Sequence, residues 1–142
     1  MMTGKTKPIP AMIARAREAM RRAHAPYSKF PVGAVVRGES GRLYAGCNVE
    51  NAAYPEGWCA ETSAIAAMVA AGEKRIAEAL VMGKGRGLIT PCGGCRQRLR
   101  EFADDDLPIH LCGPAGHRRT IALGELLPLS FGPGHVKRGR GR

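Results

Sequence analysis

Helical and strand-like segments alternate along this chain in an order that few architectures accommodate. Apolar residues recur at helical spacing in three segments, residues 10–24, 59–71 and 92–102. Strands are predicted for five apolar or alternating segments, residues 32–36, 43–47, 76–82, 109–112 and 120–122, and a last helical turn for residues 124–127. This order predicts an α/β protein with one mixed sheet that helices cover on both faces.

The length of the chain bounds its organisation. Its 142 residues, 44% of them hydrophobic, suffice for one compact domain with a modest core. We predict a single domain over residues 1–134 and a flexible basic tail over residues 135–142. The longest uninterrupted apolar run, residues 64–71, is far shorter than the roughly 20 residues of a membrane-spanning helix. The first residues also lack the apolar core of a signal peptide, so we expect a cytoplasmic protein without a membrane partner.

The positive charge of the chain gathers at its two ends. The formal net charge is +10, and six of these charges lie in the first seven and the last six residues. A short basic end rich in glycine is typically solvated, and only seven aromatic residues are available for stacking on bases. Nucleic acid is therefore not the expected partner.

The five cysteines favour metal binding or catalysis. An odd number in a chain without an export signal argues against a disulfide framework. Cys92 and Cys95 stand at positions i and i+3 of a predicted helix, and Cys59 begins another helix, so three thiolates can reach one metal. Three ligands leave one position open, which is typical of a catalytic zinc that lowers the pKa of its bound water. Glu61 is two residues from Cys59 and could transfer protons beside the metal.

Simpler interpretations of these residues also exist. A lone C-x-x-C segment fits a redox pair or half of a structural zinc site. A structural site needs a fourth ligand, and the other cysteines and histidines are Cys47, Cys112, His24, His110, His117 and His135. None stands at a short ligand spacing from Cys59, and Cys47 and Cys112 are better interpreted as small buried residues of strands. Glu61 by itself also fits a carboxylate that the helix dipole favours in a first turn.

From about residue 14 to residue 131 the chain resembles the small cytidine deaminase family. The resemblance rests on C-A-E at 59–61, P-C-G-G-C at 91–95, A-P-Y-S-K-F-P-V-G-A at 25–34, G-C-N-V-E-N-A-A-Y at 46–54 and E-L-L-P at 125–128. It implies a three-layer α/β/α sandwich with a single five-stranded mixed sheet and one zinc per chain. The implied reaction is the hydrolytic deamination of cytidine and deoxycytidine in pyrimidine salvage. The implied assembly is a homotetramer with shared active sites, and the only other partner is a small nucleoside.

The resemblance also implies a role for each matching residue. Cys59, Cys92 and Cys95 would bind zinc, and Glu61 would carry protons from the zinc-bound water to N3 of the base and then to the leaving amino group. Seven residues would contact the substrate, namely Phe30, Asn48, Glu50, Tyr54, Ala60, Thr90 and Phe131.

Those seven contacts divide into three kinds. Asn48 and Glu50 would hold the ribose hydroxyls, because alternate residues of one edge strand share a face. Phe30 would pack on the base, while the Ala60 N–H and the Thr90 carbonyl would bond its edge. By the same resemblance, Tyr54 and Phe131 match positions where a neighbouring subunit closes the pocket.

Three features depart from the family pattern. Thr62 stands where the family has an arginine that offsets the negative thiolates, so we expect the helix N-termini with Arg96 or Arg98 to supply the positive charge. Trp58, directly before the first ligand Cys59, is larger than the residue that the family pattern leads us to expect at this position. The loop at 83–89 is similar to that of blasticidin S deaminase, so a deaminase of a modified cytosine nucleoside is an alternative. An RNA- or DNA-editing deaminase and a structural zinc module are further alternatives.

Overall fold

The computed structural model describes residues 7–136 and contains one mixed sheet of five strands. The strands are β1 (Val32–Gly38), β2 (Leu43–Cys47), β3 (Ile76–Gly83), β4 (Pro108–Gly113) and β5 (Gly116–Ala122). They lie in the order β2-β1-β3-β4-β5, with β3 and β4 parallel and the other neighbours antiparallel. The predicted mixed sheet is therefore confirmed.

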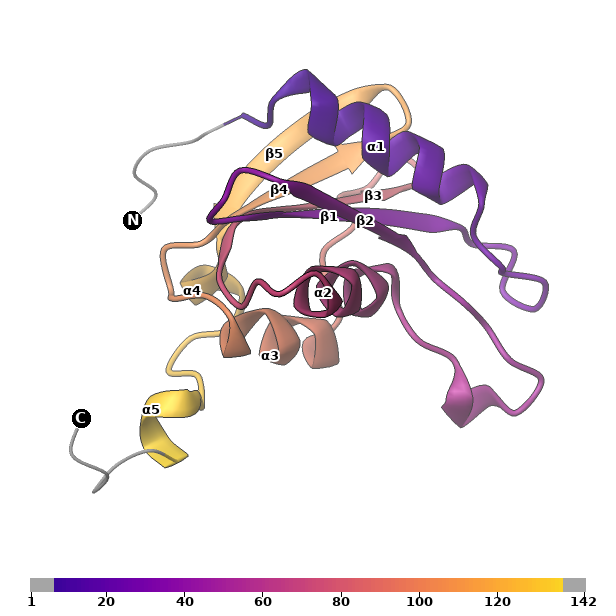
Figure 1. Cartoon of the computed structure of the whole chain (residues 1–142). Helices are drawn as coiled ribbons and strands as arrows, with labels where there is room; N and C mark the ends of the chain where they lie inside the picture. Colours follow the sequence, from indigo (N-terminus) through magenta and orange to yellow (C-terminus); the bar gives the residue numbers. More distant parts are fainter. Residues whose placement is uncertain (1–6, 137–142) are drawn as a thin grey trace.

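Helices cover both faces of this sheet (Figure 1). The helices are α1 (Pro10–Arg21), α2 (Ala60–Ala70), α3 (Gly93–Glu101), α4 (Leu123–Leu126) and α5 (Pro133–Val136), with a 3₁₀ helix at Tyr54–Glu56. On one face α1 buries Met12 and Met20 against the sheet, and on the other α2 and α3 bury residues such as Met68 and Leu99. Two separate apolar clusters form because each side of a sheet needs its own helical cover. The α/β/α sandwich predicted from the sequence is confirmed.

Two glycines let the helices approach the sheet closely. A Cβ on Gly33 of β1 would overlap the carbonyl oxygen of Ala16 in α1, and a Cβ on Gly46 of β2 would overlap the backbone nitrogen of Ala64 in α2. Only a residue without a side chain permits this backbone contact. The position of α2, and with it the residues at its first turn, is thereby tied to β2.

Some predicted boundaries are wrong. The first helix ends at Arg21 and not at residue 24, because His24 pairs with Val49 in a β-bridge. Strand β5 begins four residues before the predicted start. The first half of this edge strand contains exposed, positively charged residues, so its sequence has no apolar pattern that would predict a strand. The helix α5 takes the first two residues of the predicted tail, and the rest of the tail lies outside the described residues.

No helix within residues 7–136 is both long enough and apolar enough to cross a membrane.

Candidate active site

The predicted zinc ligands lie at the N-termini of two neighbouring helices. Cys59 is the N-cap of α2, Cys92 is the N-cap of α3, and Cys95 lies in the first turn of α3. The two helices lie side by side under the sheet (Figure 1). A helix N-terminus presents unpaired N–H groups and the positive end of its dipole, which stabilises a thiolate. The fold thus directs two positive helix ends at the three sulfurs.

The spacing of the sulfurs fits a zinc ion. The three Sγ atoms all lie within 4.8 Å of one another, and those of Cys59 and Cys92 are 3.7 Å apart. Tetrahedral zinc with Zn–S bonds of about 2.3 Å requires sulfurs about 3.8 Å apart. Among residues 7–136, the cluster contains no fourth histidine, cysteine or carboxylate. The arrangement therefore matches a three-ligand site that leaves one coordination position for water.

The other cysteines and His110 have different surroundings. His110 is fully buried, and its Nε2 lies 3.0 Å from the carboxylate of Glu78. Cys112 of β4 packs in the apolar cluster that α1 covers, and burial raises the pKa of its thiol to about 11. Cys112 is thus a buried packing residue, as predicted, whereas Cys47 is only half-buried. Neither supports the structural zinc interpretation.

Glu61 lies at the second position of α2, beside the sulfurs. Its side chain is only 5% exposed, and burial raises the pKa of its carboxyl. A raised pKa brings a carboxyl closer to the pH at which it can both accept and release a proton. Because Glu61 also lines a cavity, it can exchange that proton with a bound molecule.

A cavity of about 360 Å³ brings most of the predicted site residues together. Its volume is within the range of small-molecule sites, about 300–1,000 Å³. The predicted residues that line it are Phe30, Asn48, Glu50, Cys59, Ala60, Glu61, Thr90 and Cys92. Sequence reasoning assigned no role to the remaining residues of its wall, which are Val32, Val49, Gly57, Trp58, Val81 and Ile89. The valines gave no signal, because apolar strand residues look alike in sequence whether they face a core or a cavity.

Asn48 and Glu50 hold the backbone that carries Phe30. Asn48 Oδ1 accepts from the N–H of Val32 at 2.9 Å, and Asn48 Nδ2 donates to the carbonyl of Phe30 at 3.0 Å. Glu50 accepts from the N–H groups of Tyr27 and Ser28 at 3.0 and 3.1 Å and from the Ser28 hydroxyl. The Ser28 hydroxyl keeps the pKa of Glu50 below its ordinary value. The wall of the cavity is therefore built on these two polar side chains.

The expectation that Asn48 and Glu50 belong to an edge strand is wrong. Strand β2 ends at Cys47, and the pair flanks Val49, which forms isolated bridges with His24 and Trp58. The chain leaves the sheet here because the N–H of Val49 donates to the carbonyl of Trp58, and the N–H of Glu50 donates to that of His24. The extended backbone at this point still places both side chains at the cavity.

The two arginines expected near the sulfurs have different contacts. Arg96 donates to the carbonyls of Pro91 and Leu126 at 2.7 and 2.8 Å and to the hydroxyl of Thr90 at 3.0 Å. Arg98 donates from Nη1 to the sulfur of Cys95 at 3.6 Å. Arg96 thus holds the turn that leads into α3, and of the two only Arg98 reaches a candidate ligand.

Trp58 and the loop after β3 are held by specific bonds. The indole Nε1 of Trp58 donates to Ser63 Oγ at 2.8 Å, which keeps the ring at the cavity wall. Arg118 of β5 donates to the carbonyls of Gly85 and Gly87 at 2.6 and 2.8 Å. This loop leads to Ile89 and Thr90, so Arg118 sets the position of the cavity wall there.

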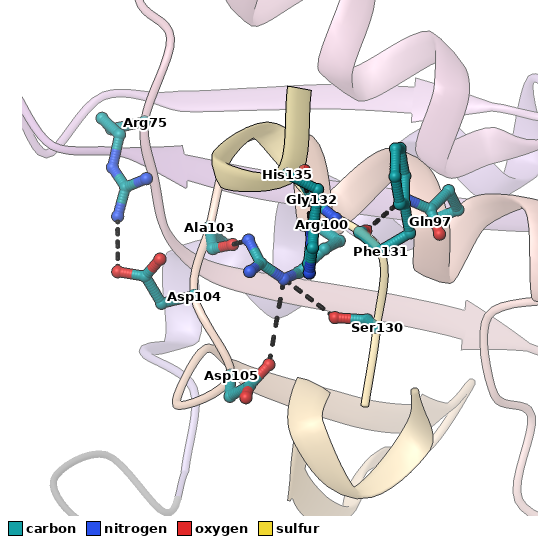
Figure 2. Close-up of polar contacts among 10 residues, drawn as sticks. All are labelled: Arg75, Gln97, Arg100, Ala103, Asp104, Asp105, Ser130, Phe131, Gly132 and His135. Atoms are coloured by element: carbon teal, nitrogen blue, oxygen red, sulfur yellow. Dashed lines mark hydrogen bonds and ion pairs between the residues drawn. The ribbon is translucent and has the colours of Figure 1, made fainter. Parts of the chain in front are cut away.

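Tyr54 and Phe131 lie outside this cavity. Their side chains are 74% and 60% exposed. The Phe131 carbonyl accepts from Gln97 Nε2 at 2.8 Å, and its ring stacks on His135 with 5.2 Å between centroids. Figure 2 shows Arg100 of α3 beside this segment, donating to Ser130 Oγ at 2.9 Å. The C-terminal segment is thereby attached to α3 while the Phe131 ring stays accessible.

Comparison with known proteins identifies the family. The family model of the cytidine and deoxycytidylate deaminase zinc-binding region matches residues 7–111. A cytidine deaminase of Sporosarcina psychrophila is 37% identical over 123 residues, which cover 87% of this chain and 90% of the relative. One of Mycobacterium tuberculosis (strain H37Rv) is 41% identical over 126 residues, with coverages of 88% and 90%. The crystal structure of cytidine deaminase from Burkholderia pseudomallei aligns with a TM-score of 0.82 at 40% identity, covering 87% of this chain and 99% of that one. The chain therefore belongs to the family of zinc-dependent cytidine and deoxycytidylate deaminases.

Proposed function

We propose that this enzyme hydrolyses cytidine and deoxycytidine to uridine and deoxyuridine with release of ammonia. The observation that carries the proposal is the cluster of three sulfurs beside the buried Glu61, with Cys59, Cys92 and Glu61 in the wall of one cavity. The relatives named cytidine deaminase support the same reaction. They favour an unmodified nucleoside over a modified one, and we include pyrimidine salvage in the cytoplasm in this proposal.

Cys59, Cys92 and Cys95 would hold one zinc ion per chain. When bound, zinc acts as a Lewis acid that makes a water molecule nucleophilic near neutral pH. The Glu61 carboxylate takes a proton from the attacking water and delivers it to N3 of the base, which makes C4 electrophilic. It then carries the remaining proton of that water from the new C4 hydroxyl to the amino group, so the C4–N bond breaks, ammonia leaves and the C4 carbonyl forms. Glu61 ends the cycle in its starting protonation state.

The remaining cavity residues orient the nucleoside. The N–H of Ala60 is in the first turn of α2, where it has no partner within the helix, and it can donate to the base carbonyl. The carbonyl of Thr90 accepts from the amino group, and the ring of Phe30 packs on the base. Asn48 and Glu50 are assigned to the ribose hydroxyls, because a carboxylate accepts hydrogen bonds and an amide can both donate and accept them.

A spectrophotometric assay tests the reaction directly. Protein loaded with one zinc per chain is expected to convert cytidine to uridine, seen as loss of the cytidine absorption band with an equal amount of ammonia released. Protein stripped of zinc by a chelator is expected to be inactive until zinc is restored. The proposal fails if zinc-loaded protein leaves both cytidine and deoxycytidine unchanged, and blasticidin S would then be the next substrate to test.

We infer further that four copies assemble and share their active sites. The exposed rings of Tyr54 and Phe131 support this, because each lies outside the cavity of its own chain. Phe131→Ala is expected to reduce kcat/KM for cytidine by about tenfold or more, the cost of losing an aromatic contact of about 1.5 kcal/mol. Mixed assemblies of Phe131→Ala and Glu61→Gln copies are expected to regain activity, because some sites then combine two native contributions. A fully active monomer in sedimentation would contradict the shared site.

A further inference from the structure

The charge of the proposed metal centre needs compensation. Zinc with three thiolates carries a net charge of −1, and the side chain of Cys95 is fully buried. A negative centre at a buried sulfur is costly unless positive groups face it. The two helix N-termini supply only partial charges of about +0.5 each. A full cation in contact with a sulfur would lower the cost further.

Arg98 is placed to act as this cation. It lies three residues after Cys95, on the same face of α3, and its Nη1 donates to the Cys95 sulfur at 3.6 Å. The guanidinium folds back over Gly94, where a Cβ would lie 3.1 Å from Nη1. The missing side chain at Gly94 therefore leaves the space through which the guanidinium reaches the sulfur.

The neighbouring groups do not duplicate this contact. The Arg96 guanidinium donates its hydrogen bonds to two backbone carbonyls and to the hydroxyl of Thr90 instead of to a sulfur. Thr62 places its hydroxyl 3.8 Å from the Cys95 sulfur, but a hydroxyl carries no net charge. Thr62 of α2 and Arg98 of α3 thus approach the same sulfur, one neutral and the other positive.

We propose that Arg98 is a positioning residue that holds the Cys95 thiolate by a charge-assisted hydrogen bond and thereby strengthens zinc binding. This inference rests on the proposed zinc-dependent function, and it makes position 98 of α3 the source of the full positive charge. Residues that contact a metal ligand from outside typically alter metal affinity by about 10- to 100-fold. Because Arg98 lies on an exposed surface of α3, solvent and salt weaken its interaction with the sulfur, and we expect a change in zinc affinity near tenfold.

Zinc affinity tests this role without reference to catalysis. Competition with a chromophoric chelator is expected to show zinc bound about tenfold more weakly by Arg98→Met than by the parent protein. Arg98→Lys keeps the positive charge but loses the planar guanidinium, so its zinc affinity should lie between those of the parent and Arg98→Met. Arg21→Met removes the same charge from the exposed end of α1 and should leave the affinity unchanged. Equal affinities for Arg98→Met and Arg21→Met would overturn the proposal.

A double-mutant cycle with Thr62 sharpens the test. In the parent, Thr62→Arg is expected to change zinc affinity by less than about threefold, because the sulfur already has its cation. In the Arg98→Met background the same substitution should restore most of the lost affinity, so the two effects are not additive. A strong gain from Thr62→Arg in the parent would contradict the inference. If the parent binds zinc but leaves cytidine unchanged, the proposed function fails, whereas the effect of Arg98 on zinc is measured independently.

Discussion

Glu61→Gln is expected to reduce cytidine turnover by about 10⁴-fold while zinc remains bound. General acid–base catalysis contributes about 10²–10⁴ to a rate, and Glu61 is assigned two proton transfers in one cycle, which favours the upper limit. Glutamine has nearly the same size and fits the same buried position, but its amide is neither a proton acceptor nor an acid near neutral pH and cannot carry the proton. Turnover is measured by the loss of cytidine absorption and zinc by its content per chain.

A matched carboxylate serves as the control. Glu18 is an exposed residue of α1 that pairs with Arg22 at 3.2 Å, so Glu18→Gln makes the same chemical change far from the cavity. Its turnover should stay within about twofold of the parent, since exposed ion pairs contribute little to stability. If Glu61→Gln retained more than a tenth of the parent activity, Glu61 would not be the proton carrier.

Cys92→Ser is expected to abolish zinc retention and to lower turnover by roughly 10³-fold or more, because the Lewis acid contributes several kcal/mol to the barrier. Serine is a poor zinc ligand compared with a thiolate. It is, however, a favoured N-cap residue, so the start of α3 should remain intact at this position. The loss would therefore report on the metal and not on the helix. Zinc content after dialysis and the circular dichroism spectrum measure the two effects separately.

Cys47 provides the comparison for this substitution. It is half-buried at the end of β2 and lies outside the sulfur cluster, so Cys47→Ser should keep both zinc and activity. Loss of zinc from Cys47→Ser, or its retention by Cys92→Ser, would show that the ligands have been assigned incorrectly.

The local features of the fold were readable from the sequence. Proline at the start of α1, glycine after α2 and apolar residues at helical spacing predicted the helices, because these signals act within a few residues. The C-x-x-C spacing likewise predicted that Cys92 and Cys95 lie together at the start of α3, whereas Cys59 reaches them only because α2 packs beside α3. The start of β5 was missed because its exposed polar residues carry no apolar pattern.

The surroundings of the site depended on packing between distant segments. The sequence offered Arg96 and Arg98 as equal candidates for the positive charge. In the structure Arg96 donates to the Pro91 carbonyl in the turn before α3, whereas Arg98 donates to the Cys95 sulfur. Nothing local indicated that Val81 of β3 would line a cavity.

The residues of this chain by themselves determined helices α1 to α4, most of the strands and the identity of the candidate zinc ligands and Glu61, because each of these signals lies within a short segment. Only the tertiary structure decided the order of the strands, the parallel pairing of β3 with β4, and the exposure of the Phe131 ring outside its own cavity. These features depend on contacts between residues tens of positions apart. Such contacts exist only once both faces of the sheet are covered and each long side chain has been oriented by its neighbours.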